Sequence, residues 1–274
     1  MFFPIFSSNW VHPPGQYQNP LRYSNTMKFP CYDFQIGHTK EKSYQLMKTH
    51  MFAHMGGDWR IDDEFIYTYF SCFEKYEDSH ILVVAGGPST NVLDWEPKNY
   101  DYIWSLNQFY LNPKLANTNV DLITVSGEIN LLDGRFHDYL EKYHPWVGFE
   151  PHHRWMRNPI ETTAFQKSHD KIFAYASRFY GKIGGGVRLI ILACVLGAKK
   201  ISFVGLDGPK PIFEGNHAFE PGKNLLPSEI NEQNADEVFT FQYDIFWDYI
   251  QNLYPKVIFD SLDKTNKYHA KISR

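Results

Sequence analysis

Small and polar residues follow several short apolar runs of the chain, and these residues are the best placed to bind a ligand. The run at residues 81–85 is continuous and rich in β-branched residues, which is typical of a strand buried on both faces of a parallel sheet. In such sheets the ligand lies beyond the carboxyl ends of the strands. We therefore expect four segments to converge on one site: Gly86-Gly87-Pro88-Ser89, Asn107-Gln108, Ser126-Gly127 and Asp207-Gly208.

The turn at residues 86–89 has the composition of an anion-binding turn. Two adjacent glycines let the backbone turn sharply and let a ligand approach without meeting a Cβ atom. Pro88 suits the first turn of a helix, and the N–H groups of a helix start attract anions. A tight connection without a ligand explains the same residues, because the spacing is not that of the full dinucleotide motif.

A second glycine turn, Gly184-Gly185-Gly186, is preceded by groups that suit a phosphate. Arg178 and Lys182 carry positive charge and Tyr180 carries a hydroxyl, so all three are candidates to stabilise a phosphate. The other explanation of Arg178 and Lys182 is that they are ordinary surface charges exposed to solvent. Asp207, at the end of a predicted strand, either binds a ribose hydroxyl or caps the turn that follows.

Strands alternate with helices along most of the chain, which predicts an α/β fold. We expect a Rossmann-like, mainly parallel sheet with helices on both faces. The predicted strands are residues 81–85, 102–106, 121–125, 201–205 and 257–259, and helices are predicted between them at residues 187–196 and 235–254.

The 274 residues divide into two predicted regions. Residues 1–79 form an N-terminal extension, an arm followed by helices at 39–54 and 62–76. Residues 80–274 form a single nucleotide-binding domain. A lid or insert is expected at residues 128–180, where aromatic residues and histidines are mixed without a clear period.

Composition excludes several classes of protein. A net charge of -4 does not favour a nucleic-acid binder. Three cysteines without metal-ligand spacing indicate a reducing compartment, so we expect a cytoplasmic location, with peripheral attachment to a membrane left open. No apolar stretch is long enough for a transmembrane segment. We also find no Walker loop, nucleophile elbow or zinc motif, and expect no metal.

Several motifs in this order resemble the bacterial sialyltransferases of glycosyltransferase family 42. The resemblance covers about residues 80–260, and its glycine-rich parts are shared with archaeal pterin diphosphokinases and with the flagellin-modifying Maf glycosyltransferases. It is carried by Ala85-Gly86-Gly87-Pro88-Ser89, Asn107-Gln108-Phe109-Tyr110, Ile183-Gly184-Gly185-Gly186-Val187, Val204-Gly205-Leu206-Asp207 and His217-Ala218-Phe219-Glu220.

The resemblance implies transfer of sialic acid, or a related sugar, from a CMP-sugar donor to a glycan acceptor, with inversion and without metal or cofactor. Gly87, Pro88 and Ser89 would line the cytidine phosphate site. Asn107 would contact the nucleotide, and residues 184–186 would approach the donor through their N–H groups. Ser126 stands where the family reads the nucleotide with an asparagine.

The resemblance also locates two catalytic positions at which this chain differs. His217 stands where the family has a tyrosine that stabilises the leaving phosphate. The family's histidine base aligns with Asn231, whose amide cannot accept a proton from a hydroxyl. We predict His217 as the substitute base, with His169, His152 and His153 as alternatives. A pterin-type diphosphokinase and a non-catalytic descendant that binds a nucleotide or glycan remain the rival functions. The acceptor and the oligomeric state stay open.

Overall fold

The computed structural model of the chain describes residues 31–33, 71–126, 129–149, 159–176, 183–223 and 230–272. These residues form an eight-stranded sheet in the order β1-β6-β5-β4-β3-β2-β7-β8, with every adjacent pair parallel. The strands are β1 (Cys31–Asp33), β2 (His80–Val84), β3 (Tyr102–Leu106), β4 (Leu122–Val125), β5 (Trp146–Phe149), β6 (Ile172–Ala176), β7 (Lys200–Val204) and β8 (Ile258–Ser261).

Helices connect the strands. The α-helices are α2 (Ser89–Val92), α3 (Pro113–Ala116), α4 (Gly134–Tyr143), α6 (Pro159–Ser168), α7 (Gly186–Val195), α8 (Lys210–Phe213) and α9 (Ala235–Leu253). Short 3-10 helices are η3 (Ser71–Tyr76), η4 (Pro97–Asn99), η5 (Phe109–Leu111) and η6 (Lys267–His269).

The strand order reverses beside β2. From β2 the chain adds β3, β4, β5 and β6 in sequence on one side, and then returns to place β7 and β8 on the other side. The boundary between β2 and β7 is therefore the topological switch point, and the crevice at such a point is where open α/β sheets bind their ligands.

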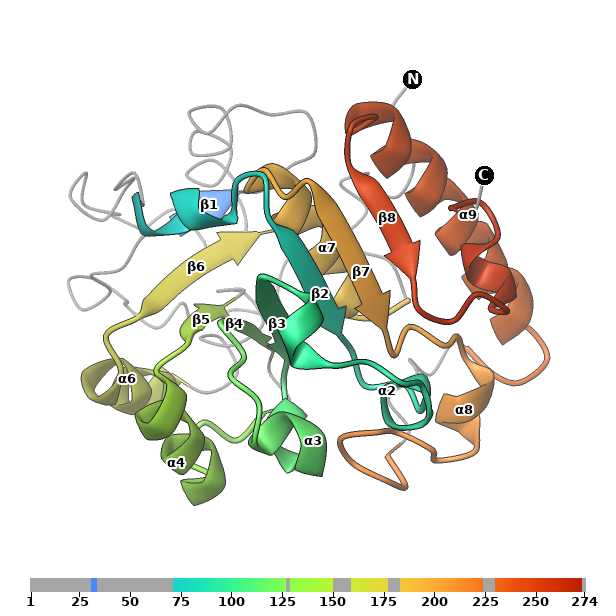
Figure 1. Cartoon of the computed structure of the whole chain (residues 1–274). Helices are drawn as coiled ribbons and strands as arrows, with labels where there is room; N and C mark the ends of the chain where they lie inside the picture. The colour runs from blue at the N-terminus through green and yellow to red at the C-terminus, as the bar shows by residue number, and fades with distance from the viewer. Residues whose placement is uncertain are drawn as a thin grey trace, which may run out of the picture.

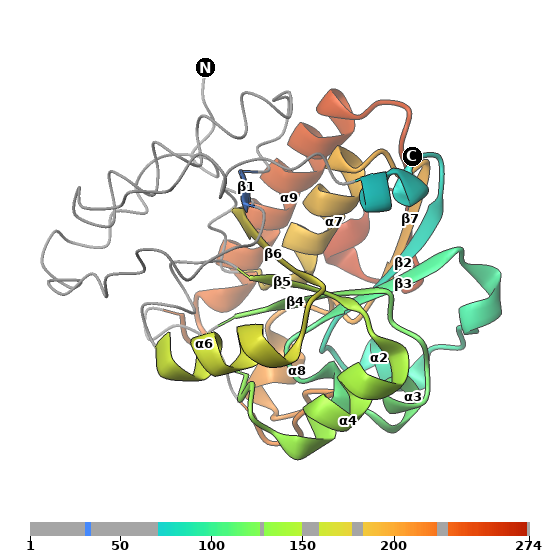
Figure 2. The same cartoon turned by 90° about the vertical axis from the view of Figure 1, so that its left-hand side faces the viewer.

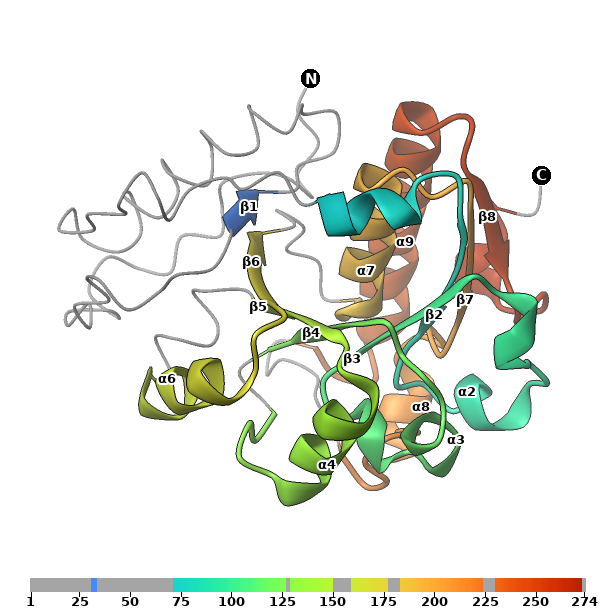
Figure 3. The same cartoon turned by 60° about the vertical axis from the view of Figure 1, so that its left-hand side comes forward.

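Both faces of the sheet are buried, which explains the continuous apolar strands. Ile81 and Val83 of β2 belong to a core on the face covered by α7 and α9 (Figure 3). Leu82 and Val84 alternate with them and belong to a second core, on the opposite face. The helices of that second face include α3, α4 and α6 (Figure 2).

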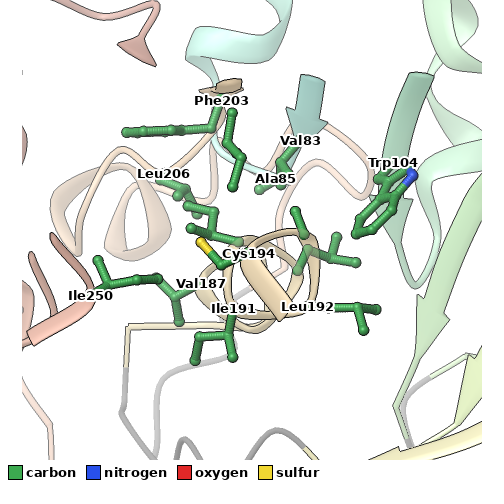
Figure 4. Packing of buried hydrophobic residues seen from close by; sticks show 14 of the residues in the cluster. Val83, Ala85, Trp104, Val187, Ile191, Leu192, Cys194, Phe203, Leu206 and Ile250 are labelled. Carbon is green, nitrogen blue, oxygen red and sulfur yellow. The ribbon is translucent and has the colours of Figure 1, made fainter. Parts of the chain in front are cut away.

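Helix α7 is buried almost all round. Val187, Ile191 and Leu192 are at most 1% exposed. Figure 4 shows them around the α7 axis, with Val83 of the sheet and Ile250 of α9 on different sides of the helix. Because α7 is fixed between two layers, its N-terminus holds a set position at the carboxyl ends of the strands.

The structure confirms the predicted fold class, and the five predicted strands lie within a few residues of the observed ones. The stretch 128–180 differs from the predicted lid or insert, because it contributes β5 and β6 to the sheet. Their apolar runs are short and flanked by aromatics and histidines, which obscured the strand pattern.

The N-terminal region also takes part in the sheet. Cys31 of β1 pairs with Ala174 of β6, so at least three residues of the predicted extension belong to the domain's sheet. The helix expected at 39–54 and most of that at 62–76 lie outside the described residues. Among the residues that are described, no helix has the length and apolar character needed to cross a membrane.

Candidate functional site

Four neighbouring strands end at the same edge of the sheet, and the predicted site segments follow them. Val84 of β2 pairs with Val204 of β7 and with Ser105 of β3. Continuing this register brings Gly86 between Leu206 and Asn107. Leu106 pairs with Thr124 of β4, so Ser126 lies at the same edge. The arrowheads of β2 and β7 point toward α2 and α8 (Figure 1).

Asp207 holds the turn that follows β2. Its Oδ2 accepts a hydrogen bond of 2.7 Å from the Ser89 N–H, and its Oδ1 accepts one from the Ser89 hydroxyl. Ser89 Oγ in turn accepts from the Gly205 N–H at 2.9 Å. Burial raises the pKa of Asp207, and the two bonds from Ser89 oppose that shift. Asp207 therefore caps the turn after β2, whereas we expected it to cap the turn that follows Asp207 itself; its predicted bond to a ribose hydroxyl stays a prediction.

Gly86 and Gly87 are required by the protein's own packing. A Cβ on Gly86 would lie 2.3 Å from His217 Nε2, and a Cβ on Gly87 would lie 2.5 Å from Asp207 Oδ2. We expected these glycines to leave room for a ligand, but on the Cβ side that room is filled by His217 and Asp207. A ligand at this turn must therefore approach from another side.

The second glycine turn packs the start of α7 against the strand ends. A Cβ on Gly185 would lie 2.7 Å from Leu106 Cδ1, and one on Gly186 would lie 2.5 Å from Leu206 Cδ2. Gly184 has a φ of +91° and no atom within 4 Å of its Cβ position. Gly184 is thus the member of this turn that faces open space, while its two neighbours serve packing.

His217 is oriented as a hydrogen-bond donor. Its Nδ1 accepts from the N–H groups of Phe219 and Glu220, both at 3.2 Å. Burial lowers the pKa of His217, Lys223 lowers it further and Glu220 opposes the shift. The ring is therefore neutral near pH 7 with its proton on Nε2, the atom beside Gly86. This geometry does not suit the predicted role as a base, because neither nitrogen is free to accept a proton.

Asn112 fixes the His217 loop, residues 214–223, against the turn after β2. The Ala218 N–H donates to the Gly86 carbonyl at 2.7 Å. The Asn112 amide donates to the Ala218 carbonyl at 3.1 Å and to Asn91 Oδ1 at 2.7 Å. Asn112 is 1% exposed. The Asn112-Pro113 pair is a sequence signal for a helix start, but sequence reasoning missed this residue.

Asn107 joins the ends of β3 and β4. Its φ of 49° lies in the left-handed region, which asparagine tolerates better than most residues. Its Oδ1 accepts from the Ser126 N–H at 2.8 Å. The amide nitrogen of Asn107 donates no hydrogen bond to the part of the chain that the structure describes. It is therefore available to a ligand at this edge.

The other predicted residues fall into four groups. Pro88 immediately precedes α2 and buried Gln108 precedes η5, so both lie at the strand-end edge. Asn231 is exposed and accepts from the Gln233 and Asn234 N–H groups in the turn before α9. His169 precedes β6 and so lies at the opposite edge of the sheet. Arg178, Tyr180, Lys182, His152 and His153 lie outside the described residues.

Comparison with known proteins gives one kind of match. No protein-family model matches the sequence, and neither does any curated protein. Among solved structures, the sialyltransferase CstII from Campylobacter jejuni in complex with cytidine-5'-monophosphate is similar over 72% of this chain and 84% of its own, at 13% identity and a TM-score of 0.47. A second structure, of the sialyltransferase CST-II with a trisaccharide acceptor and CMP, is similar over 70% of this chain and 84% of its own. The identity is again 13% and the TM-score 0.47.

Proposed function

We propose that this protein is a glycosyltransferase-like enzyme that binds a CMP-sugar at the switch point between β2 and β7. One observation carries the proposal: donors from separate segments remain available around the end of β2. They are the amide nitrogen of Asn107, Nε2 of His217, and the N–H of Gly86, which makes no hydrogen bond within the described residues. Several neutral hydrogen-bond donors around one point suit a phosphate, because they can stabilise its negative oxygens.

The donors would act on the leaving group. In an inverting transfer the acceptor oxygen attacks the anomeric carbon, the bond from that carbon to the phosphate oxygen breaks, and CMP departs with the electron pair. The proton of the acceptor hydroxyl passes to a base. His217 Nε2–H would donate to the departing phosphate, which agrees with the leaving-group position that the family resemblance implies for His217. Sialic acid, or a related sugar, is the group we expect to be transferred to a glycan.

Calorimetry with CMP tests the binding step. We expect the chain to bind CMP, and we expect His217→Ala and Asn107→Gly each to weaken binding about tenfold, the usual effect of one hydrogen bond to a charged group. Glycine is chosen at position 107 because it keeps the left-handed backbone. His137→Ala, on α4 and away from this edge, is the matched control. Absence of binding by CMP and by other nucleotides at millimolar concentration would reject the proposal.

A non-catalytic role has its own supporting observation. Asn231, which replaces the family's base, only caps a turn, and His217 is arranged as a donor. In that case the chain would bind CMP but would not release CMP from CMP-sialic acid in the presence of glycan acceptors. Chromatographic assay of CMP release therefore separates an enzyme from a nucleotide-binding or glycan-binding descendant.

A further inference from the structure

We infer that His144, His169 and Asp170 form a site for a divalent transition-metal ion, Zn²⁺ above all, at the amino ends of β5 and β6. Each residue offers one ligand atom, and these atoms all lie within 4.8 Å of one another. The site lies at the edge of the sheet opposite the β2–β7 switch point, so it is independent of the proposed CMP site.

Parallel pairing brings the three residues together. Val147 of β5 pairs with Ile172 of β6, and the Val147 N–H donates to the Lys171 carbonyl at 2.9 Å. His144 lies just before β5, and His169 and Asp170 lie just before β6. The approaches to the two strands therefore run side by side, although they come from different connections of the chain.

His169 is the preorganised ligand. It is 6% exposed, and its Nε2 lies 2.9 Å from the Pro145 carbonyl oxygen. Since a carbonyl only accepts, the ring proton is on Nε2 and Nδ1 keeps its lone pair. Histidine ligands of metals commonly donate their other N–H to a backbone carbonyl, which fixes the tautomer and the ring orientation.

His144 and Asp170 can complete the site by small rotations. His144 Nε2 lies 2.9 Å from Asp170 Oδ1, and their side chains are 48% and 80% exposed. Around tetrahedral Zn²⁺, with bonds of roughly 2.0–2.1 Å, neighbouring ligand atoms are about 3.4 Å apart. Two exposed side chains can move from the observed spacing to that distance without disturbing the core.

The ligand set determines the class of ion. Two imidazole nitrogens and one carboxylate suit Zn²⁺, with water as the fourth ligand, better than they suit Mg²⁺ or Ca²⁺, which prefer oxygen. The positive charge of Lys171 would repel a cation at this site, but the Lys171 ammonium donates a hydrogen bond of 2.9 Å to the His144 carbonyl. A bound ion would tie the end of α4 to the end of α6 and so stabilise this side of the sheet.

Zinc titration of the full-length, metal-free chain tests the inference. We expect the wild type to bind one Zn²⁺ at this site. His144→Ala, His169→Gln and Asp170→Ala should each lose this ion or bind it more than tenfold more weakly. Even residues that only support a metal ligand contribute about 10–100-fold to metal affinity. His137→Ala on α4 should keep the wild-type stoichiometry. At a hundredfold excess over Kd, zinc should raise the Tm of the wild type by about 5 °C, and EDTA should reverse the rise.

If His169→Gln does not fold, the variants at the two exposed residues, His144→Ala and Asp170→Ala, still test the inference. The inference is overturned if the wild type binds no zinc, or if His144→Ala and Asp170→Ala bind as many zinc ions as the wild type with equal affinity. Zinc at histidines elsewhere would be retained in these variants. Cobalt gives a second readout: a tetrahedral Co²⁺ absorption band in the wild type and in His137→Ala should be absent from both exposed-site variants.

Discussion

At the scale of single residues, Gly205 is a position that tolerates no side chain without a change in the backbone. Its φ is +80°, and a Cβ there would lie 2.2 Å from the Ala85 carbonyl oxygen and 2.4 Å from Thr90 Oγ1. The nearest obstacle is backbone and cannot rotate away. Any side chain must therefore either strain Gly205 or separate the ends of β2 and β7.

We expect Gly205→Ala to lower the free energy of unfolding by about 3 kcal/mol, since left-handed strain contributes about 1–2 kcal/mol and the collision with a carbonyl adds to it. Gly134→Ala is the matched control, because a Cβ there meets nothing within 4 Å, and we expect a change within about 0.5 kcal/mol. Urea unfolding measures both. Equal midpoints for the two variants would contradict this account of Gly205.

The residue types of the site were predictable, and their partners were not. Glycines, serine and aspartate at strand ends indicated a site edge. That Asp207 uses both oxygens on Ser89, and that His217 receives two N–H groups at Nδ1, depends on loop geometry that no local pattern encodes. Sequence reasoning placed His217 in a polar loop beside the turn, but it assigned this residue a base role that its tautomer does not suit.

At the scale of elements, Asn112 connects three segments. It caps α3 by accepting from the Lys114 N–H at 3.0 Å, and its amide binds Asn91 of α2 and Ala218 of the His217 loop. Because the loop contacts Gly86 through Ala218, loss of Asn112 should release His217 from the end of β2.

We expect Asn112→Ala to destabilise the fold by about 2 kcal/mol, because it leaves buried groups without partners, and to speed proteolytic cleavage within residues 214–223 about tenfold. Asn117→Ala is the control, since Asn117 is exposed at the other end of α3 and its side chain bonds only the Pro113 carbonyl among the described residues. Mass spectrometry of timed digests locates the cuts. Equal cleavage rates in both variants would show that Asn112 does not fix the loop.

Elements with a clear apolar signal were predictable, and weaker ones were not. β2, β3, β4 and β7 are mainly apolar, and α7 is apolar except for Arg188. β5 and β6 were assigned to an insert because each has only four or five residues between aromatics and histidines. β1 has three residues, and its pairing with β6 depends on a contact distant in sequence.

At the scale of the whole molecule, the C-terminal segment fastens the site edge to the core through His269. This side chain is 3% exposed and its Nε2 donates to the Leu206 carbonyl at 2.8 Å, next to Asp207. The ring packs against Phe203, Tyr243 and Trp247. Burial lowers the pKa of His269 to about 4, against the opposing effects of the Leu206 bond and of Asp263.

This burial should make the fold sensitive to acid. Between pH 6.5 and about 4 the unfolded chain binds a proton at His269 and the folded chain does not, so stability falls as pH falls, by about 1.4 kcal/mol per unit. We expect His269→Gln to lose this part of the slope while retaining the parts due to His80, His169 and His217, whose pKa values are also lowered. Thermal unfolding across this pH range measures the slopes, and equal slopes would refute the assignment.

The parallel architecture followed from alternation of strands and helices, but the strand order did not. Nothing local indicates that β7 returns to the side of β2 opposite β3. The switch point, and with it the location of the candidate site, depends on contacts between segments far apart in sequence, such as the packing of α7 and α9 in one core.

The close approach of Gly205 to the Ala85 carbonyl also determines the register of β7 against β2. When strands are apolar on both faces, a shift of the register by one residue exposes no apolar side chain to water. The pattern of polar and apolar side chains therefore specifies the register only weakly. Here a slip would push a Cβ into the Ala85 carbonyl. Gly205 therefore fixes the register of β7 against β2. It keeps the groups that follow these two strands level with each other at the carboxyl edge of the sheet.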